Sequence, residues 1–236
     1  MADEKTEVRL SSAKNTHNSV LISFSAFLGM VAHLVAIVFC GTIIYHAWPG
    51  SSLFSWHPTL MSVAFAFLVL EAIMFFSPES TLLPKAMRKT KVRYHWINNV
   101  TGLVCALAGV ITIVSNKYMN NKPHFTTWHG LLGIITVGYC AMQCIAGSFM
   151  LYPKMISQYV KLSDLKLYHA TSGVMMFTLA CGTMVLGIFS NWFVSQASDT
   201  VFYMCLFCPG ILALVVTNQV TQAYLPKAFK KRSQQI

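Results

Sequence analysis

Charged residues are scarce in this sequence of 236 residues, and acidic residues are the scarcest. Only 10% of the residues are charged, against about 25% in ordinary soluble domains, and seven acidic residues stand against 17 basic ones. A soluble enzyme or an acidic scaffold is therefore excluded. A disordered chain is excluded as well, because 55% of the residues are hydrophobic, among them 16 Phe and 13 Met. The composition is that of an integral membrane protein. The net charge of +10, which in a soluble protein would suggest nucleic-acid binding, therefore needs another explanation.

Six apolar stretches are each long enough to cross a bilayer as a helix, which needs about 20 residues. The sequence predicts spans at residues 21–45, 57–76, 95–115, 128–151, 167–192 and 201–223. The expected fold is therefore an all-α integral membrane protein with six transmembrane helices. We expect a tail at residues 1–20, the six-helix domain at residues 21–223 and a second tail at residues 224–236. The seven cysteines all lie in apolar stretches, which is typical of small packing residues.

The basic residues predict an orientation in the membrane. Apart from Lys117 and Lys122, all 17 lie at the two termini or in the second and fourth connections between spans. Basic residues accumulate on the cytosolic side of membrane proteins. Both termini are therefore predicted to be cytosolic. The first span is too long for the apolar region of a signal peptide, so we expect it to remain as a helix.

Four of the eight histidines recur near the beginning of a predicted span: His57, His95, His129 and His169. Consecutive spans run in opposite directions, so His57 and His129 lie toward the non-cytosolic face and His95 and His169 toward the cytosolic face. In a central four-helix bundle of spans two to five, the members of each pair come from alternate helices and can face one another. Two such imidazoles can fill both axial positions of a haem iron. The sequence thus predicts two bis-histidine sites for a haem iron, one near each face.

Two glycines fit this arrangement. Gly133 follows His129 by four residues and Gly173 follows His169 by four, so each shares a helix face with its histidine. A glycine there lets a flat macrocycle approach the backbone. The alternative is ordinary packing of small residues between membrane helices.

Four segments around these histidines carry a family resemblance. In order they read LFSWHPTLM (53–61), RYHW (93–96), TTWHGLLG (126–133) and LKLYHATSG (165–173), and together they resemble the cytochrome b561 family of transmembrane electron carriers. The resemblance implies two haem b groups, held by His57 with His129 and by His95 with His169. It implies an ascorbate-dependent oxidoreductase, with cytosolic ascorbate as electron donor and monodehydroascorbate or ferric ion as acceptor on the lumenal side. It further implies an endomembrane location, in the endoplasmic reticulum or cytoplasmic vesicles, and a homodimer.

Cationic residues close to the paired histidines are candidates to bind these substrates. Lys89, Lys91 and Arg93 immediately precede His95 and can attract ascorbate, which is a monoanion at neutral pH. The alternative is that they only fix the topology and contact anionic lipid. On the other face, the candidates to hold an acceptor are Lys122 and His124.

The sequence does not decide the roles of several other ionisable residues inside the spans. His33, in the middle of the first span, is expected to hydrogen-bond a neighbouring helix. Glu71 either accepts a proton when ascorbate is oxidised or hydrogen-bonds within the bundle. Cys205 and Cys208 form a C-x-x-C that favours packing over redox chemistry, since no basic neighbour lowers the thiol pKa. The alternative function is a haem-free transporter of divalent metal ions, which would use the four histidines as ligands but has only Glu71 as an acidic partner.

Overall fold

A computed structural model describes the backbone of residues 2–152, 154 and 159–233, and the side chains of residues 19–20, 22–152, 154 and 159–224. The basic side chains at the two termini lie outside the described side chains. Within this part of the chain, six helices are long and apolar enough to cross a membrane. The prediction of a six-helix integral membrane protein is confirmed. The ordered elements are α1 (Ala2–Ala47), α2 (Trp56–Met61), a π-helix η1 (Ser62–Val69), α3 (Leu70–Met74), α4 (Arg88–Met119), α5 (Trp128–Phe149), α7 (Leu162–Ile188), α8 (Asn191–Gln196) and α9 (Asp199–Ser233).

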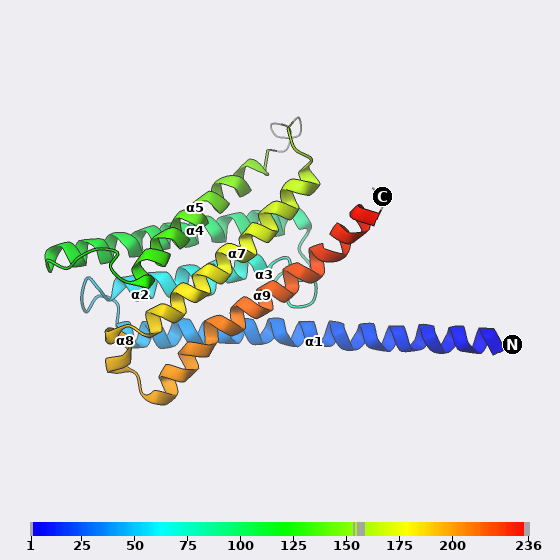
Figure 1. The fold of residues 1–236 in the computed structure, drawn as a ribbon, viewed down its shortest axis with the longest axis horizontal. Helices are drawn as coiled ribbons and strands as arrows, with labels where there is room; N and C mark the ends of the chain where they lie inside the picture. Colours follow the sequence, from blue (N-terminus) through cyan, green and yellow to red (C-terminus); the bar gives the residue numbers. More distant parts are fainter. Residues whose placement is uncertain (1, 153, 155–158, 234–236) are drawn as a thin grey trace.

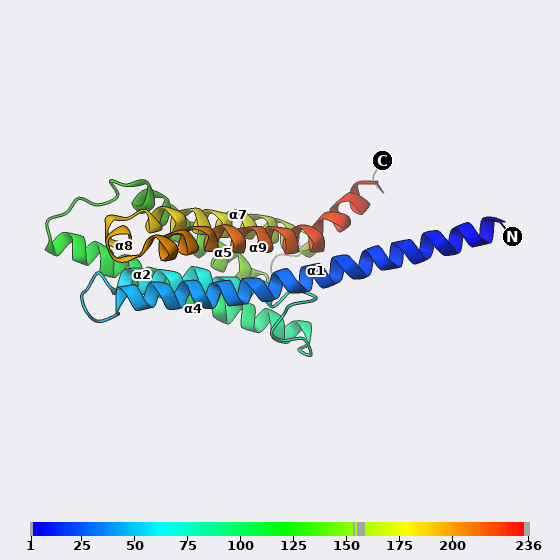
Figure 2. The same cartoon turned by 90° about the horizontal axis from the view of Figure 1, so that it is seen from below.

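The six spans form two layers of three. The second span, made of α2, η1 and α3, packs between α1 and α4, while α7 packs between α5 and α9 (Figures 1 and 2). Contacts of α1 with α9 and of α4 with α5 join the layers. Spans two to five are therefore a four-helix bundle, as expected, and α1 and α9 cover one of its sides. Both termini lie at the same end of the molecule (Figure 1).

Small residues hold α1 against the second span. Ala32 and Ala36 of α1 and Ala64 and Ala66 of η1 are fully buried, and α1 contacts η1. Small side chains allow membrane helices to approach closely. Large apolar side chains on the outer surface of α1, such as Phe27 at 63% exposure, face the lipid instead. All seven cysteines are free thiols, and five of them are buried.

The helices α1, α4 and α7 begin earlier than the spans predicted for them. α4 begins at Arg88 and α7 at Leu162, so His95 and His169 each lie seven residues into their helices and not in the first turn. The prediction placed these starts at the edge of the apolar stretch, whereas the helices extend through basic and polar residues beyond it. His57 and His129 do lie at helix starts, each as the second residue of its helix. The helix α1 likewise begins at Ala2, well before the first predicted span.

The second span is not a regular α-helix. Eight residues, Ser62–Val69, have the wider π-helical hydrogen-bond pattern, which frequently occurs at functional sites. The Cys40 thiol of α1 donates to the Ser62 carbonyl at 3.3 Å. No feature of the sequence predicts this segment.

Candidate functional site

The first histidine pair joins the second span to α5. The ring centroids of His57 and His129 lie 6.1 Å apart, with an angle of 87° between the ring planes. Nδ1 of His57 donates to the Gly109 carbonyl at 2.9 Å, and Nδ1 of His129 donates to the Thr183 carbonyl at 2.9 Å. A carbonyl oxygen only accepts, so each Nδ1 carries the ring proton. Each Nε2 is left with its lone pair.

The second pair joins α4 to α7 at the other end of the bundle. The ring centroids of His95 and His169 lie 6.2 Å apart, at an angle of 74°. Nδ1 of His95 donates to the Ala72 carbonyl at 2.8 Å, which again leaves Nε2 with a lone pair. Nδ1 of His169 is buried and has no hydrogen-bond partner among the described residues. The structure therefore brings together the two pairs of histidines that the sequence predicts. Hydrogen bonds to backbone carbonyls hold three of the four rings in place.

Glycines lie directly against two of the rings. A Cβ atom added to Gly187 would lie 3.0 Å from Cε1 of His129, and one added to Gly147 would lie 3.3 Å from Cε1 of His169. Any larger residue would press on the imidazole. Sequence reasoning missed both glycines, although a signal was available. Gly147 follows His129 on α5 by 18 residues, and Gly187 follows His169 on α7 by the same number. Eighteen residues make five helical turns, so each glycine lies on the same helix face as the histidine before it.

The two predicted glycines occupy other positions. A Cβ atom at Gly133 would lie 3.6 Å from Cγ2 of Thr183, and one at Gly173 would meet no atom within 4 Å. Gly133 lines a cavity beside His57 and His129, and Gly173 lines a cavity beside His95 and His169. Gly173 thus leaves open space beside its histidine pair, whereas a Cβ atom at Gly133 would make an ordinary van der Waals contact.

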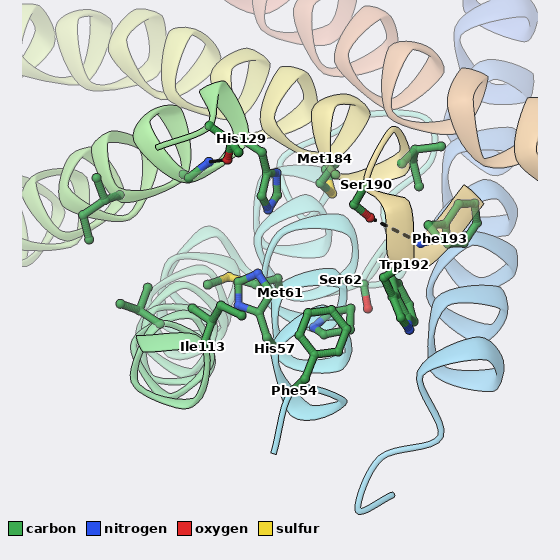
Figure 3. Close-up of a pocket in the computed structure, with 18 of the residues that line it drawn as sticks. Phe54, His57, Met61, Ser62, Ile113, His129, Met184, Ser190, Trp192 and Phe193 are labelled. Carbon is green, nitrogen blue, oxygen red and sulfur yellow. Dashed lines mark hydrogen bonds between the residues drawn. The ribbon is translucent and has the colours of Figure 1, made fainter. Parts of the chain in front are cut away.

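The cavity beside the first pair, named here the His57 cavity, has a volume of about 270 Å³. Figure 3 shows His57 and His129 turned toward each other from the second span and α5, with Met61 and Met184 nearby. At its edge the rings of Phe54 and Trp192 are in contact, with centroids 5.3 Å apart.

Two cationic or titratable side chains besides the histidine pair line the His57 cavity: Lys117 and His124. Nζ of Lys117 donates to the Pro123 carbonyl at 3.0 Å. Of the two predicted acceptor residues, His124 is therefore at the cavity and Lys122 is not among its lining residues. Sequence reasoning missed Lys117, whose place in the last turn of α4 was the available signal.

The cavity beside the second pair, named here the His95 cavity, is larger, at about 970 Å³. Among the predicted donor residues, Lys91 lines it, and Lys89 and Arg93 do not. Two further cations, Arg88 and Lys166, line it together with Asp164. Lys166 lies near the start of α7, three residues before His169, and this spacing was the available signal.

The family model for eukaryotic cytochrome b561 matches residues 56–194, a segment that contains all four paired histidines. The chain belongs to the cytochrome b561 family. Transmembrane reductase CYB561D2 of Bos taurus is 42% identical over 219 residues, which cover 93% of this chain and 97% of that protein. The Homo sapiens protein of the same name is 43% identical over 206 residues, covering 87% and 91%. The Bos taurus lysosomal membrane ascorbate-dependent ferrireductase CYB561A3 is 27% identical over 194 residues, covering 78% and 72%. This member of the cytochrome b561 family is therefore an oxidoreductase of a membrane.

The residues present fit haem b, the cofactor of the cytochrome b561 family. Histidine ligands of metals almost always donate their second ring nitrogen to a carbonyl or carboxylate, as His57, His95 and His129 do here. Each pair has a cavity beside it and a glycine against one ring. Among the described residues, no group of three or more His, Cys, Asp or Glu side chains is placed to hold a metal ion.

Proposed function

We propose that this chain carries electrons across the membrane from cytosolic ascorbate to monodehydroascorbate or ferric ion on the other side. The observation that supports this most strongly is the presence of two facing histidine pairs at opposite ends of one bundle. The name of the more distant Bos taurus relative, an ascorbate-dependent ferrireductase, supports the choice of donor and of a ferric acceptor.

In this proposal two haem b groups are bound, one by His57 with His129 and one by His95 with His169. Haem with both axial positions filled supplies a one-electron carrier and offers no open site for oxygen. The carbonyls of Gly109, Thr183 and Ala72 keep the imidazoles oriented with Nε2 available. Gly173 leaves room for a macrocycle beside its pair, and Gly133 lines the cavity beside the other.

The donor is proposed to bind at the His95 cavity. Arg88, Lys91 and Lys166 line this cavity and provide a positive field for an ascorbate monoanion. Lys89 and Arg93 add to the positive field from the same turns of α4. The acceptor is proposed to bind at the His57 cavity through Lys117 and His124, with Lys122 in the same connection.

The orientation and location form part of the proposal. Both termini lie at one end of the molecule (Figure 1), and the connections rich in basic residues belong to that end, so we place that end in the cytosol. The membrane is proposed to be that of the endoplasmic reticulum or of cytoplasmic vesicles. The six-helix domain at residues 21–223, with tails at 1–20 and 224–236, is proposed to form a homodimer.

Two measurements test the function. The purified protein should be red, with the absorption spectrum of low-spin haem and two haems per chain; a colourless protein that transports divalent metal ions would overturn the proposal in favour of the transporter. In vesicles loaded with ascorbate, an acceptor kept outside should be reduced. Equal reduction in vesicles that lack the protein would show that the chain does not carry the electrons.

A further inference from the structure

A polar pair joins α1 to the second span, and neither of its residues belongs to the two facing histidine pairs. His33 on α1 and Glu71 on α3 approach within 2.6 Å, between Nδ1 and Oε1, and their side chains are only 8% and 4% exposed. The predicted hydrogen bond of His33 to a neighbouring helix is thus confirmed. Ionisable side chains at membrane depth are costly, and in many membrane proteins they belong to proton or ion pathways.

The hydrogen bonds of His33 determine how many protons the pair holds. Nε2 of His33 lies 2.8 Å from the Ser80 carbonyl, which only accepts, so Nε2 carries a proton. The contact between Nδ1 and Oε1 needs a second proton, because a bare imidazole nitrogen and a carboxylate oxygen would each present a lone pair. The pair therefore holds one shared proton and has no net charge, whether the proton resides on Nδ1 or on Oε1.

One atom of the pair remains available. Oε2 of Glu71 is buried and has no hydrogen-bond partner among the described residues. An unpaired carboxyl oxygen in apolar surroundings is costly, so it needs a compensating role or partner. Nδ1 of His33 and Oε1 of Glu71 already share one proton, and Nε2 of His33 carries another. Oε2 is therefore the atom of the pair where one further proton would bind.

The pair is linked to the His95 site through the backbone. Glu71 directly precedes Ala72, whose carbonyl accepts the hydrogen bond from Nδ1 of His95. No other carboxylate of the described chain is buried. The charge on Glu71 is thus placed to affect the energy of an electron at the His95 site.

A chain of polar groups leads from the pair toward the end of the bundle. Oγ of Ser80 lies 2.7 Å from Oγ of Ser77 and accepts from Nε2 of Gln219 at 3.2 Å. Both serines are buried, and the adjoining Glu79 is exposed. Gly29 of α1 packs directly on this group, since an added Cβ atom would clash with the side chain of Ser80. A small polar network that joins Ser80, Ser77 and Gln219 therefore lies beside the pair.

Few other ionisable groups surround the pair. From α4, His95 is joined through Ala72, and Tyr94 packs against Phe75. The basic side chains of α4 lie nearer its start, apart from Lys117 in its last turn. The connection contributes the exposed Glu79. From α9 the network includes Gln219, with Tyr224 five residues further on, and η1 carries no ionisable residue.

We propose that His33 and Glu71 form a proton-binding site that takes up one proton when one electron enters the His95 site. This rests on the proposed function. Oxidation of an ascorbate monoanion to the monodehydroascorbate radical anion releases one electron and one proton. The electron would pass to the haem that His95 and His169 are proposed to hold, and the proton binds Oε2 of Glu71, which leaves His33 as imidazolium beside a neutral carboxylic acid. The positive charge offsets the added electron in a medium of low dielectric constant. The proton leaves when the electron moves on.

The decisive experiment is a redox titration of the haem-loaded, full-length protein between pH 6 and pH 8. In the wild type, the midpoint potential of the haem that His95→Ala removes should fall with rising pH. The limit is about 59 mV per pH unit for one proton per electron, because a tenfold change in proton concentration corresponds to 59 mV when one electron is transferred. Glu71→Gln keeps an amide beside His33 but binds no proton, so this slope should disappear. Glu79→Gln removes an exposed carboxylate nearby and should keep the wild-type slope.

Infrared difference spectroscopy gives a second readout on the same samples. Reduction of the wild type should produce a band of a newly protonated carboxylic acid, which shifts in D₂O and is absent in Glu71→Gln. If Glu71→Gln does not fold, His33→Gln should weaken the same band and flatten the same slope. A wild-type potential that is independent of pH, or equal slopes in the wild type and Glu71→Gln, would overturn the proposal. The titration uses a chemical reductant, so it tests the proton-binding site even if ascorbate does not reduce the protein. A failure of ascorbate to reduce the protein would count against the proposed function and not against the proton-binding site.

Discussion

Gly187 of α7 lies directly against the imidazole of His129 on α5, where an added Cβ atom would approach Cε1 to 3.0 Å. The ring has little freedom to move away, because its Nδ1 is bonded to the Thr183 carbonyl, one turn earlier on the same helix α7. The glycine and the carbonyl together define the position of the ring.

We expect Gly187→Ala to weaken haem binding at the first pair. Overpacking a tight contact costs about 1–3 kcal/mol, and about 1.4 kcal/mol corresponds to a tenfold change in an equilibrium constant. The affinity for one of the two haems should therefore fall about tenfold, as measured by haem titration of the apoprotein. Gly182→Ala on the same helix, where an added Cβ atom meets nothing within 4 Å, is the matched control. Equal loss in both variants would mean that helix α7 as a whole is disturbed.

The corresponding change at the other pair should have a smaller effect. Gly147→Ala brings a Cβ atom to 3.3 Å from Cε1 of His169, and Nδ1 of this histidine has no partner to hold the ring in place. The ring can yield by a few tenths of an ångström. We expect a shift in the spectrum of the second haem with both haems retained. Loss of the first haem in this variant would contradict the assignment of Gly147 to His169.

Single replacements of the paired histidines should divide into two classes. His57→Ala and His129→Ala should each remove the same haem, and His95→Ala and His169→Ala the other, because each iron loses one axial ligand. A pyridine haemochrome assay should give two haems per wild-type chain and about one per folded variant. Identical spectra for His57→Ala and His95→Ala would show that the pairing by membrane face is wrong.

The sequence predicted the six spans and the pairing of histidines because both follow from periodic or one-dimensional signals: apolar length, and the alternation of helix direction. It also predicted that His33 would be hydrogen-bonded, since a lone buried histidine needs a partner. It did not predict that His95 lies seven residues into its helix, because helix ends in basic segments are set by hydrogen bonds and not by hydropathy. The contacts of Gly147 and Gly187 depend on the relative height of two helices, which sequence spacing alone does not determine.

The acceptor side offers a comparison between a residue found in the structure and one expected from the sequence. Lys117 lines the His57 cavity and Lys122 does not. Lys117→Gln should therefore lower the rate at which an anionic ferric chelate is reduced more than Lys122→Gln does. The rate of haem oxidation by the chelate, followed by stopped-flow absorbance, measures both. A larger effect of Lys122→Gln would favour the sequence-based assignment.

On the donor side, cations that line the His95 cavity can be compared with cations that do not, and the dependence on salt gives a second test. Arg88, Lys91 and Lys166 line the His95 cavity, so changing all three to Gln should slow reduction by ascorbate about tenfold or more, which lies within the range for electrostatic steering. Changing Lys89 and Arg93 to Gln removes two charges outside the lining and should have a smaller effect. A neutral reductant should react at similar rates with all variants, because it does not feel the field. Added salt should slow the wild type and hardly affect the triple variant, since exposed charges are screened beyond about 10 Å at 0.1 M ionic strength. Equal slowing with charged and neutral reductants would mean that the substitutions disturbed the His95 site itself, and these cations would then serve only the topology.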